Sequence, residues 1–563
     1  MNLNLRTTSL TAPIPALVLG ILITLICLTF IENHAIWYSG VAFWDIINYD
    51  DRPMSWVLLV ILISLVALFQ RLPRWIEYLP DWIGGHPLRI ALGTTTTLAI
   101  LALVAYHNFP LSMDEYAPWF QAKIFAAGTL TGRFPPELID HLISTPYQGH
   151  FFAVDRQTGA VISTYWPGFA LLLTPFMVLG TPWLCNPLIV GATLMMIWKL
   201  TLDITQDCRT AGWAMLFTLA SPAVTLNGIS YYSMSAHLLT SAIFVWLLLD
   251  PTPRRCFTAG LVGAFALSLH NPYPHLVFML PWVVWIVARK GVFRLLPLSA
   301  GYLVLGTPLV LMWTKFRADL LSATMRFMSP PITAPHAETQ GTLDAVFDIL
   351  AGLFSSPSPE MLLARSGGLL KIWLWASPLL LVLAIAGLRY SRHVVMRYLM
   401  ASAISTLLAY YLIRFDQGMG WGYRYFHPAF LALPVLAAVA VRHLEMKTDA
   451  SRQWPALAVT LALCGLSIMT PGYALLMERR VSSAIHDMPP AIANRSLKIL
   501  SGRGYCATVR CDLLHNDPWL RGDVVLIDKK QQMTQEDIGR LFPGVRKVAT
   551  NPYGTTYRLP EDK

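Results

Sequence analysis

Two adjacent carboxylates, Asp114 and Glu115, are the residues of this sequence best placed to do chemistry. They follow an apolar segment at 89–106 that is long enough to cross a membrane, and they lie in a short stretch at 110–118. Because a charge beside lipid is costly, we expect both carboxylates to face a water-filled cavity. Neighbouring residues on a helix point ~100° apart, so one carboxylate could transfer a proton while the other supports it. A solvated acidic pair at a helix end is the alternative interpretation.

A second group of polar residues lies at 421–428, where the sequence reads Trp-Gly-Tyr-Arg-Tyr-Phe-His-Pro. It enters an apolar segment at 425–441, so Arg424 is expected at membrane depth near the outer start of a helix. A guanidinium there suits a phosphate, which it can bind through two N–H groups, and helix N-termini also favour anions. Alternatively, Arg424 extends to lipid headgroups and the aromatic residues form an interfacial belt. His427 is expected to be structural.

Further candidates surround these two groups. Lys123 is a second cation that could bind phosphate. Residues expected to line a substrate pocket are Tyr116, Tyr165, Trp166, Trp421, Tyr423 and His237. Other polar residues at predicted outer helix ends are each more typical of a structural role, but together they would make an outer cavity cationic. They are His270, His275, Tyr231, Tyr232, Lys315, Arg317 and Arg414.

The composition of the chain indicates whether these residues belong to a soluble protein or to a membrane protein. Hydrophobic residues make up 55% of the chain and charged residues only 13%, against roughly a quarter charged in an ordinary soluble domain. Segments apolar enough to cross a ~30 Å hydrocarbon layer lie at 13–31, 54–70, 89–106, 184–200, 211–226, 236–249, 257–270, 275–289, 295–313, 371–388, 397–413, 425–441 and 456–475. The sequence therefore predicts an all-α polytopic membrane protein with about thirteen transmembrane helices. The segments 257–270 and 275–289 could instead be one broken helix.

The orientation follows from the basic residues, because the cytoplasmic side keeps Lys and Arg. With the N-terminus inside, the short outer loops hold Arg52, Arg414 and Arg424, and the other short loops carry most of the basic residues. This assignment requires that the apolar segment 167–180 does not cross, so we expect it to be an interfacial or re-entrant helix on the outer face. The prediction is a bacterial inner (cytoplasmic) membrane protein whose site faces the periplasm or exterior.

Three parts of the chain are predicted. Residues 1–88 form two N-terminal transmembrane helices and a cytoplasmic loop, residues 89–475 form a transmembrane core with outer loops at 107–165 and 314–370, and residues 476–563 form an extracytoplasmic domain. Strand-like segments at 524–527, 547–550 and 555–559 and a helix capped by Thr534 indicate that this last domain is a small α/β fold. Outside the cytosol, Cys506 and Cys511 could form a disulfide.

Several classes of function are disfavoured. The net charge of +10 is spread in small groups between apolar segments, so nucleic acid is not an expected partner. Neither a Gly-rich phosphate loop nor a Gly-x-Ser-x-Gly elbow is present, which argues against nucleotide-dependent chemistry. We see no paired His/Cys spacing, and we expect neither a metal site nor a cofactor.

The order of these motifs resembles the GT-C class of membrane glycosyltransferases, in the branch of the protein O-mannosyltransferases and the aminoarabinose transferases of lipid A. The resemblance spans roughly 89–441 and rests on Met-Asp-Glu-Tyr-Ala at 113–117 with Ala122 and Gly128, the proline-led segment at 165–175, and residues 421–428. It implies transfer of a sugar from a polyprenyl-phosphate donor to an acceptor hydroxyl of a glycan, lipid or protein at the extracytoplasmic face. Asp114 would be the general base and Glu115 its support, with Arg424 and, second, Lys123 binding the donor phosphate.

Two features depart from that family pattern. Two helices precede the helix that carries the Asp-Glu pair, and the next outer loop, 227–237, lacks the acidic residue that relatives often have there. A transporter or flippase of lipid-linked sugars remains an alternative, which predicts charged or broken helices at mid-membrane. A polysaccharide polymerase or ligase is another, and a lipid-diphosphate donor would distinguish it.

Overall fold

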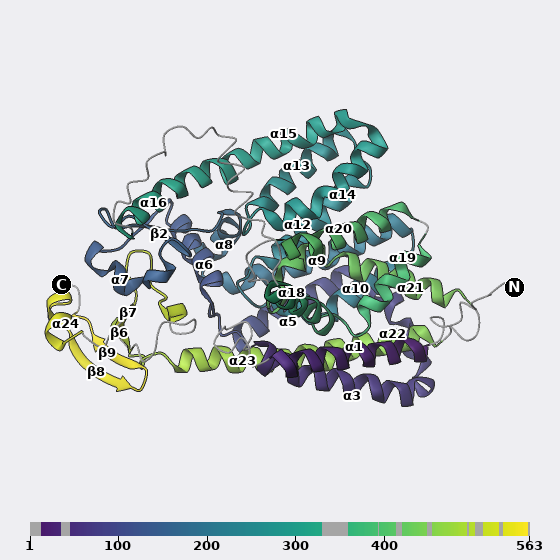
Figure 1. Cartoon of the computed structure of the whole chain (residues 1–563), viewed down its shortest axis with the longest axis horizontal. Coiled ribbons are helices and arrows are strands. Elements are labelled where there is room, and N and C mark those ends of the chain that lie inside the picture. Colours follow the sequence, from purple (N-terminus) through teal and green to yellow (C-terminus); the bar gives the residue numbers. More distant parts are fainter. Residues whose placement is uncertain are drawn as a thin grey trace.

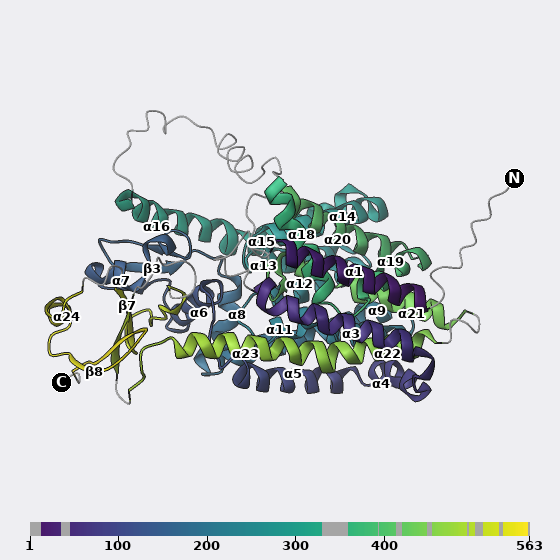
Figure 2. The same cartoon turned by 60° about the horizontal axis from the view of Figure 1, so that its bottom comes forward.

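The computed structural model describes residues 13–34, 46–328, 359–391, 393–412, 419–447, 453–492, 495–501, 511–528 and 533–560. A helical bundle makes up most of the molecule, and a small domain with a sheet lies at one end of it (Figure 1). The long helix α23 (Thr470–His486) leaves the bundle and leads to this small domain, as Figure 2 shows from a second direction. The predicted all-α polytopic fold with a small α/β C-terminal domain is confirmed.

Within the described residues, seven helical segments are long and apolar enough to cross a membrane. They are Pro13–Asn33, Ile47–Arg71, Pro87–Val104, Pro182–Thr205, Val292–Ser322, Val394–Leu412 and Trp454–His486. Their outward faces carry large exposed apolar side chains such as Val60, Ile100 and Leu303. Such contiguous apolar surface is unusual on a soluble protein, and lipid is its natural environment. The chain is an integral membrane protein.

Every apolar segment predicted to span coincides with helical structure. The helices that form the bundle and its extensions are α1 (Pro13–His34), α3 (Arg52–Leu68), α4 (Leu79–Gly85), α5 (Pro87–Val104), α9 (Cys185–Thr205), α10 (Cys208–Leu219), α11 (Pro222–Asn227), α12 (Met234–Leu248), α13 (Pro253–Leu267), α14 (Tyr273–Lys290), α15 (Leu295–Gly306), α16 (Trp313–Met328), α18 (Pro359–Leu374), α19 (Leu380–Tyr390), α20 (Val394–Leu412), α21 (Ala432–Glu445), α22 (Trp454–Cys464) and α23. Short π-helical segments extend α3, α15 and α22: η1 (Ile47–Asp51), η8 (Thr307–Met312) and η11 (Gly465–Met469).

Three predicted spans differ from the structure. The segment 211–226 is divided, because α10 ends at Leu219 and α11 begins at Pro222. The segment 371–388 is not one helix, because α18 ends at Leu374 and α19 begins at Leu380 after Leu379 takes a positive φ of 63°. Pro378 lies in this break, where a proline cannot continue the hydrogen bonding of the preceding turn. The segment 425–441 begins as a 3₁₀ helix, η9 (Arg424–Ala429), with Pro428 inside it, and the α-helix starts only at Ala432.

Three other boundaries become clear in the structure. The segments 257–270 and 275–289 are two separate helices, α13 and α14. The region 314–370, predicted as a loop, is helical at both ends, in α16 and α18. The predicted boundary at 475/476 falls inside α23, which continues from the bundle to His486, ahead of the first C-terminal strand at Ser496.

The apolar segment 167–180 forms the short helix α8 (Gly168–Val178) of 11 residues. At 1.5 Å per residue it is roughly 16 Å long, about half of a ~30 Å hydrocarbon layer. It packs against α6 (Met113–Ala126), the helix that carries the Asp-Glu pair. Its interfacial or re-entrant placement stays a prediction, because α19 (Leu380–Tyr390) is equally short.

The polar end of the molecule contains two small sheets. In the first, β1 (Gly132–Arg133), β3 (Ala160–Ser163) and β2 (Phe152–Val154) are antiparallel in that order, and α7 (Ile139–Leu142), between β1 and β2 in the chain, packs on the C-terminal strand β7. The C-terminal sheet has the order β7 (Val524–Asp528), β6 (Ser496–Ser501), β9 (Gly554–Arg558) and β8 (Arg546–Asn551), with β6 and β7 parallel. Thr534 caps α24 (Gln535–Leu541) as predicted, whereas the central strand β6 was not predicted.

The loop at 107–165 and the C-terminal domain share one hydrophobic core. Tyr116 and Phe120 from α6 pack in the same cluster as Leu497 and Leu526 from the C-terminal sheet. Trp313, at the start of α16, packs with Ile162 of β3. All three regions predicted to lie outside the membrane therefore meet at the same end of the bundle (Figures 1 and 2).

Basic loops meet at the opposite end of the bundle. Arg209, in the first turn of α10, binds Glu445 at the end of α21 at 3.0 Å and also pairs with Asp81 of α4. Arg442 binds Asp207 at 2.8 Å. Figure 2 shows α4 and α21 at the end of the bundle away from the C-terminal domain. The orientation in the membrane stays a prediction.

Candidate active site

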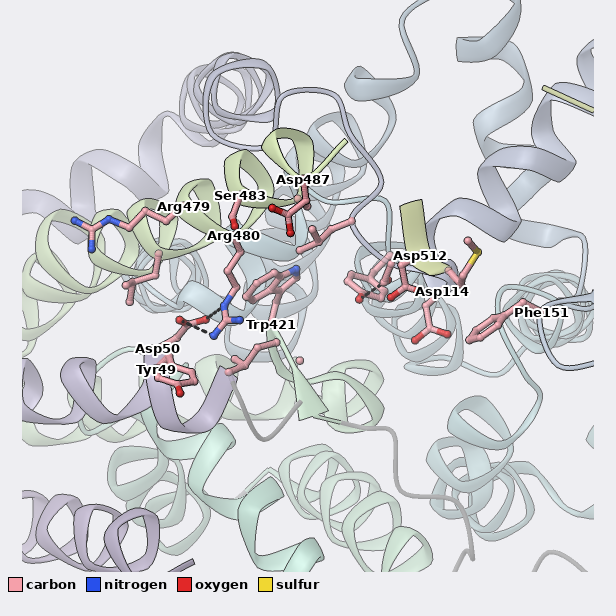
Figure 3. Close-up of a pocket in the computed structure, with 18 of the residues that line it drawn as sticks. Tyr49, Asp50, Asp114, Phe151, Trp421, Arg479, Arg480, Ser483, Asp487 and Asp512 are labelled. Carbon is pink, nitrogen blue, oxygen red and sulfur yellow. Dashed lines mark hydrogen bonds and ion pairs between the residues drawn. The ribbon is translucent and has the colours of Figure 1, made fainter. Parts of the chain in front are cut away.

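A cavity of ≈ 820 Å³ lies where the bundle meets the polar end. One wall is α23 from Leu476 onward, with Asp487 just after its end, and the facing wall is the start of α6 with the loop 146–151. The hairpin of β4 (Met419–Gly420) and β5 (Gly422–Tyr423) and the π-helical segment η1 close the sides. Figure 3 shows Trp421, at the tip of this hairpin, between the α23 side and the α6 side of the cavity.

Asp114 is the predicted catalytic residue that reaches this cavity. Its side chain is 8% exposed, and one oxygen, Oδ2, accepts a hydrogen bond at 2.6 Å from Nη1 of Arg424, which is 1% exposed. The other oxygen, Oδ1, accepts a hydrogen bond from the Tyr165 hydroxyl. The structure therefore brings together three residues that the sequence named separately, with 310 positions between Asp114 and Arg424.

The partners of Asp114 decide its charge state. Burial alone would raise the pKa of this carboxyl, but the nearby Arg424 guanidinium and the Tyr165 hydroxyl outweigh burial and lower the pKa below its usual value of 3.8. Asp114 is therefore ionised throughout the physiological range. An ionised carboxylate that lines a cavity can accept a proton from a bound hydroxyl.

Glu115 points away from the cavity and binds the protein itself. Its carboxylate accepts hydrogen bonds from the Tyr106 hydroxyl at 2.9 Å and from the backbone N–H of Leu111 at 3.0 Å and of Tyr231 at 2.8 Å. It also forms a capping box with Ser112 at the start of α6. Burial raises the pKa of Glu115 to about 7, against the effect of these hydrogen bonds. Glu115 thus fixes the helix that presents Asp114 and ties it to the loop at 228–233.

Glu115→Gln is expected to lower the free energy of unfolding by about 1.5–3 kcal/mol, the range for a hydrogen bond to a charged group. The reason is that the partners described above are all donors, and an amide nitrogen would meet them as a further donor. Thermal unfolding of the purified protein, followed by intrinsic fluorescence, measures the loss. Glu137→Gln, at an exposed glutamate of the same outer region, is the control. Equal midpoints for the two variants would contradict the anchoring role.

The hairpin that carries Trp421 is held by a buried ion pair. Gly422 has a φ of 79°, which permits the tight turn. Nζ of Lys371 donates to the backbone oxygen of Gly420 at 2.9 Å and pairs with Asp51 at 2.6 Å, and both charged side chains are fully buried. Asp51 lies in η1, so the N-terminal helices help to position this wall of the cavity.

Several predicted site residues do not line the cavity. Tyr116 donates to the backbone oxygen of Asn516, and Trp166 stacks on Arg317. Tyr423 packs against Gly368, and His237 is buried in α12. Lys123 lies 3.7 Å from Asp517 and over the Trp119 ring. Trp421 does line the cavity. The predicted disulfide involves Cys506, which lies outside the described residues.

The charges of the cavity differ from the expected cationic lining. Among the described residues that line it are four aspartates and two arginines. Besides Asp114, these are Asp50, Asp487, Asp512, Arg479 and Arg480. Of the lesser candidates expected to supply positive charge, Arg414 lies outside the described residues, and Lys315 and Arg317 are absent from the lining. The reason is that Lys315 and Arg317 lie on α16, which packs on β2 away from α23.

The acidic residues of the tail were missed because no local signal marked them. Asp512 lies in the short 3₁₀ helix η12 (Cys511–Leu513), and the fold of the C-terminal domain brings it to the cavity. Burial, together with the charges of Asp114 and Glu115, raises its pKa to about 8, although the hydrogen bond from the Tyr147 hydroxyl at 2.8 Å acts in the other direction. Arg480 forms a two-point ion pair with Asp50, at 2.6 and 3.0 Å.

Comparisons with known proteins find matches among solved structures. Two crystal structures of ArnT from Cupriavidus metallidurans are similar to this chain, one bound to undecaprenyl phosphate and one in the apo state. They are 14% and 13% identical to it, with TM-scores of 0.47 and 0.44, and the matches cover 83% of this chain and 97% and 98% of those chains. No protein-family model matches the sequence, and no curated protein matches it significantly.

Proposed function

We propose that this protein is a membrane glycosyltransferase that moves a sugar from a polyprenyl-phosphate donor to an acceptor hydroxyl at the extracytoplasmic face. The observation that carries the proposal is Asp114, buried and paired with Arg424, in a cavity between apolar helices and a polar domain. Such a cavity can receive a lipid from the bundle side and a polar acceptor from the other side. The GT-C resemblance of residues 113–117, 165–175 and 421–428 points to the same reaction.

The reaction follows from the position of Asp114. The acceptor oxygen attacks the anomeric carbon of the donor sugar while the bond from that carbon to the phosphate oxygen breaks, and the phosphate leaves with the electron pair. Asp114 takes the acceptor's proton. Since its lowered pKa makes it a weak base, we infer that the proton moves late, when the new bond has made the hydroxyl acidic. Attack from the side opposite the phosphate would invert the anomeric configuration.

The donor phosphate needs a cation. Arg424 is held by Asp114 and does not line the cavity, so it acts in this proposal by keeping Asp114 ionised. Arg479 and Arg480 on α23 line the cavity at the side of Leu476 and Ile46, which suit a lipid chain. We therefore assign the phosphate to Arg479 and Arg480, in place of Arg424 and Lys123. Figure 3 shows both on the side of Trp421 away from Asp114.

The assignment of Arg480 is tested in a variant that lacks the Asp50 carboxylate, so that removing Arg480 leaves no buried charge without its partner. Asp50→Asn is compared with the double variant Asp50→Asn, Arg480→Gln, because Asp50 is the partner of Arg480. The double variant is expected to raise the KM for the donor about tenfold, which corresponds to about 1.4 kcal/mol, with the KM for the acceptor unchanged. An unchanged donor KM would contradict the assignment.

The decisive experiment incubates purified protein in lipid nanodiscs with a panel of polyprenyl-phosphate sugars. Methyl glycosides, a serine-containing peptide and native membrane lipids serve as acceptors. Consumption of one donor, with its sugar recovered on an acceptor, is the expected result. Transfer from a polyprenyl-diphosphate donor alone would indicate a polymerase or ligase instead.

A transporter of lipid-linked sugars is the second candidate, favoured by the buried pair of Lys371 and Asp51 inside the bundle. In a transporter this pair would exchange partners as the helices move. The donor assay distinguishes the two functions, because a transporter would move labelled donor across the bilayer of a vesicle without consuming it.

A further inference from the structure

The C-terminal domain is part of the cavity rather than a neighbour of it. Asp512 lines the same cavity as Asp114, and Figure 3 shows the two carboxylates side by side. The segment that follows Asp512 is bound to α6 at several points. Tyr116 donates to the backbone oxygen of Asn516, and its ring stacks on His515 at 4.3 Å between centroids. The chain is thus built to keep Asp512 next to Asp114.

The surroundings of Asp512 suit a ring that carries hydroxyl groups. The Tyr147 hydroxyl donates to Asp512 at 2.8 Å, and Tyr147, His150 and Phe151 present aromatic surface to the cavity. Asp487 contributes a further carboxylate from the end of α23. Sites for polar small molecules typically combine aromatic walls with a few placed hydrogen-bonding groups, and carboxylates accept hydrogen bonds from hydroxyls.

We propose that the acceptor is a carbohydrate and that Asp512 binds it. Asp512 forms a hydrogen bond with the acceptor hydroxyl next to the hydroxyl that Asp114 deprotonates. The proposal rests on the proposed transferase function. In this proposal the C-terminal domain helps to select the acceptor, and the acceptor's sugar ring stacks on Tyr147, His150 and Phe151. Arg479 and Arg480, on the other side of Trp421, serve the donor.

A structural role is the competing explanation, because Asp512 also forms a hydrogen bond with the backbone of Met113, the first residue of α6. The two roles predict different effects on stability. Because the raised pKa of about 8 leaves Asp512 mostly protonated at neutral pH, Asp512→Asn keeps a neutral side chain and an oxygen that can accept these hydrogen bonds, so an acceptor-binding residue would leave the unfolding midpoint unchanged. An anchoring residue would lower it.

The test uses the full-length protein with the donor found in the panel assay and methyl glycosides as acceptors. Asp512→Asn is expected to raise the acceptor KM about tenfold, the effect of one lost hydrogen bond of ordinary strength, with the donor KM within about twofold of wild type on the same scale. Asp523→Asn is the matched control, because Asp523 lies in the same domain and pairs with Lys498 at 2.8 Å outside the cavity. It is expected to change neither KM.

Each other outcome has a definite meaning. A raised donor KM with an unchanged acceptor KM would overturn the acceptor assignment, and so would a lowered unfolding midpoint with both KM values unchanged. Transfer to the peptide but to no methyl glycoside would overturn the carbohydrate acceptor. If the wild-type protein consumes no donor at all, the transferase function itself fails, and this is distinguishable because it precedes any comparison of variants.

Discussion

Asp114→Asn is expected to reduce the rate of sugar transfer about 10²–10⁴-fold, the usual contribution of a general base, with the protein still folded in the membrane. The amide keeps the shape of the carboxylate and can still accept a hydrogen bond from Arg424, but it cannot take the acceptor's proton. The loss is expected in kcat more than in either KM, because the proton moves in the transition state. Steady-state kinetics on the purified protein measure it.

Two observations control this result. Asp155→Asn removes a carboxylate from an exposed turn of the same outer region, where Asp155 binds Thr158 and the backbone of Gln157, and full activity is expected. The unfolding midpoint of Asp114→Asn must also stay close to that of wild type, so that the loss of activity is not caused by unfolding of the variant. Wild-type kcat in the Asp114→Asn variant would rule out Asp114 as the base.

Arg424→Met is expected to destabilise the protein by about 3–5 kcal/mol, because it leaves the buried Asp114 carboxylate without its counter-ion. It is also expected to move the acidic limb of the pH–rate profile to higher pH. In the wild type the lowered pKa of Asp114 keeps the base ionised, so activity is lost only as the pH falls below 3.8. Without the guanidinium, burial dominates and the pKa rises above 3.8, so activity is lost earlier as the pH falls. Thermal unfolding and kcat/KM against pH measure the two effects.

The direction in which the stability of the same variant changes with pH can also be measured. A carboxyl with a lowered folded-state pKa stabilises the wild type above the unfolded pKa, and this stabilisation is lost as the pH falls through the folded value. In Arg424→Met the sign reverses, and stability falls as the pH rises through 3.8. The matched control is Arg156→Gln, which breaks a half-exposed pair with Asp140 and should cost only ~0–1 kcal/mol. Adding Asp114→Asn should recover part of the lost stability. If the acidic limb of the pH–rate profile does not move in Arg424→Met, Arg424 does not set the charge state of Asp114.

The sequence is sufficient to predict the class of the protein and the region of its site. Apolar segments of membrane length determine the helical bundle whatever their packing, since backbone polar groups in lipid must be satisfied within helices. The position of Asp114 just after such a segment predicts a wet site at a helix end. One local signal was available and points to the role of Glu115: Ser112 and Glu115 fit the spacing of a capping box, which predicts that this carboxylate serves its own helix.

Other features depend on contacts between distant segments. β6 carries Lys498 between buried Leu497 and Ile499, yet it is recognisable as a strand only because β7 and β9 pair with it on both sides. Pairing of strands separated by intervening chain leaves no local pattern in either of them. The break at Pro378 within an apolar run likewise has no effect on hydropathy, although it divides two helices.

What the sequence by itself determined is the membrane fold, the polar end with its α/β domain, and the candidate residues Asp114 and Arg424. Only the tertiary structure decided that these two form a pair, that Glu115 faces the protein, and that Asp512 and Arg480 enter the cavity. The physical reason is that hydropathy and helix length are properties of local sequence, whereas the direction of a side chain depends on how its helix is rotated against distant neighbours. The charge of the cavity, set by residues from η1, α6, α23 and the tail, is therefore a property of the folded molecule alone.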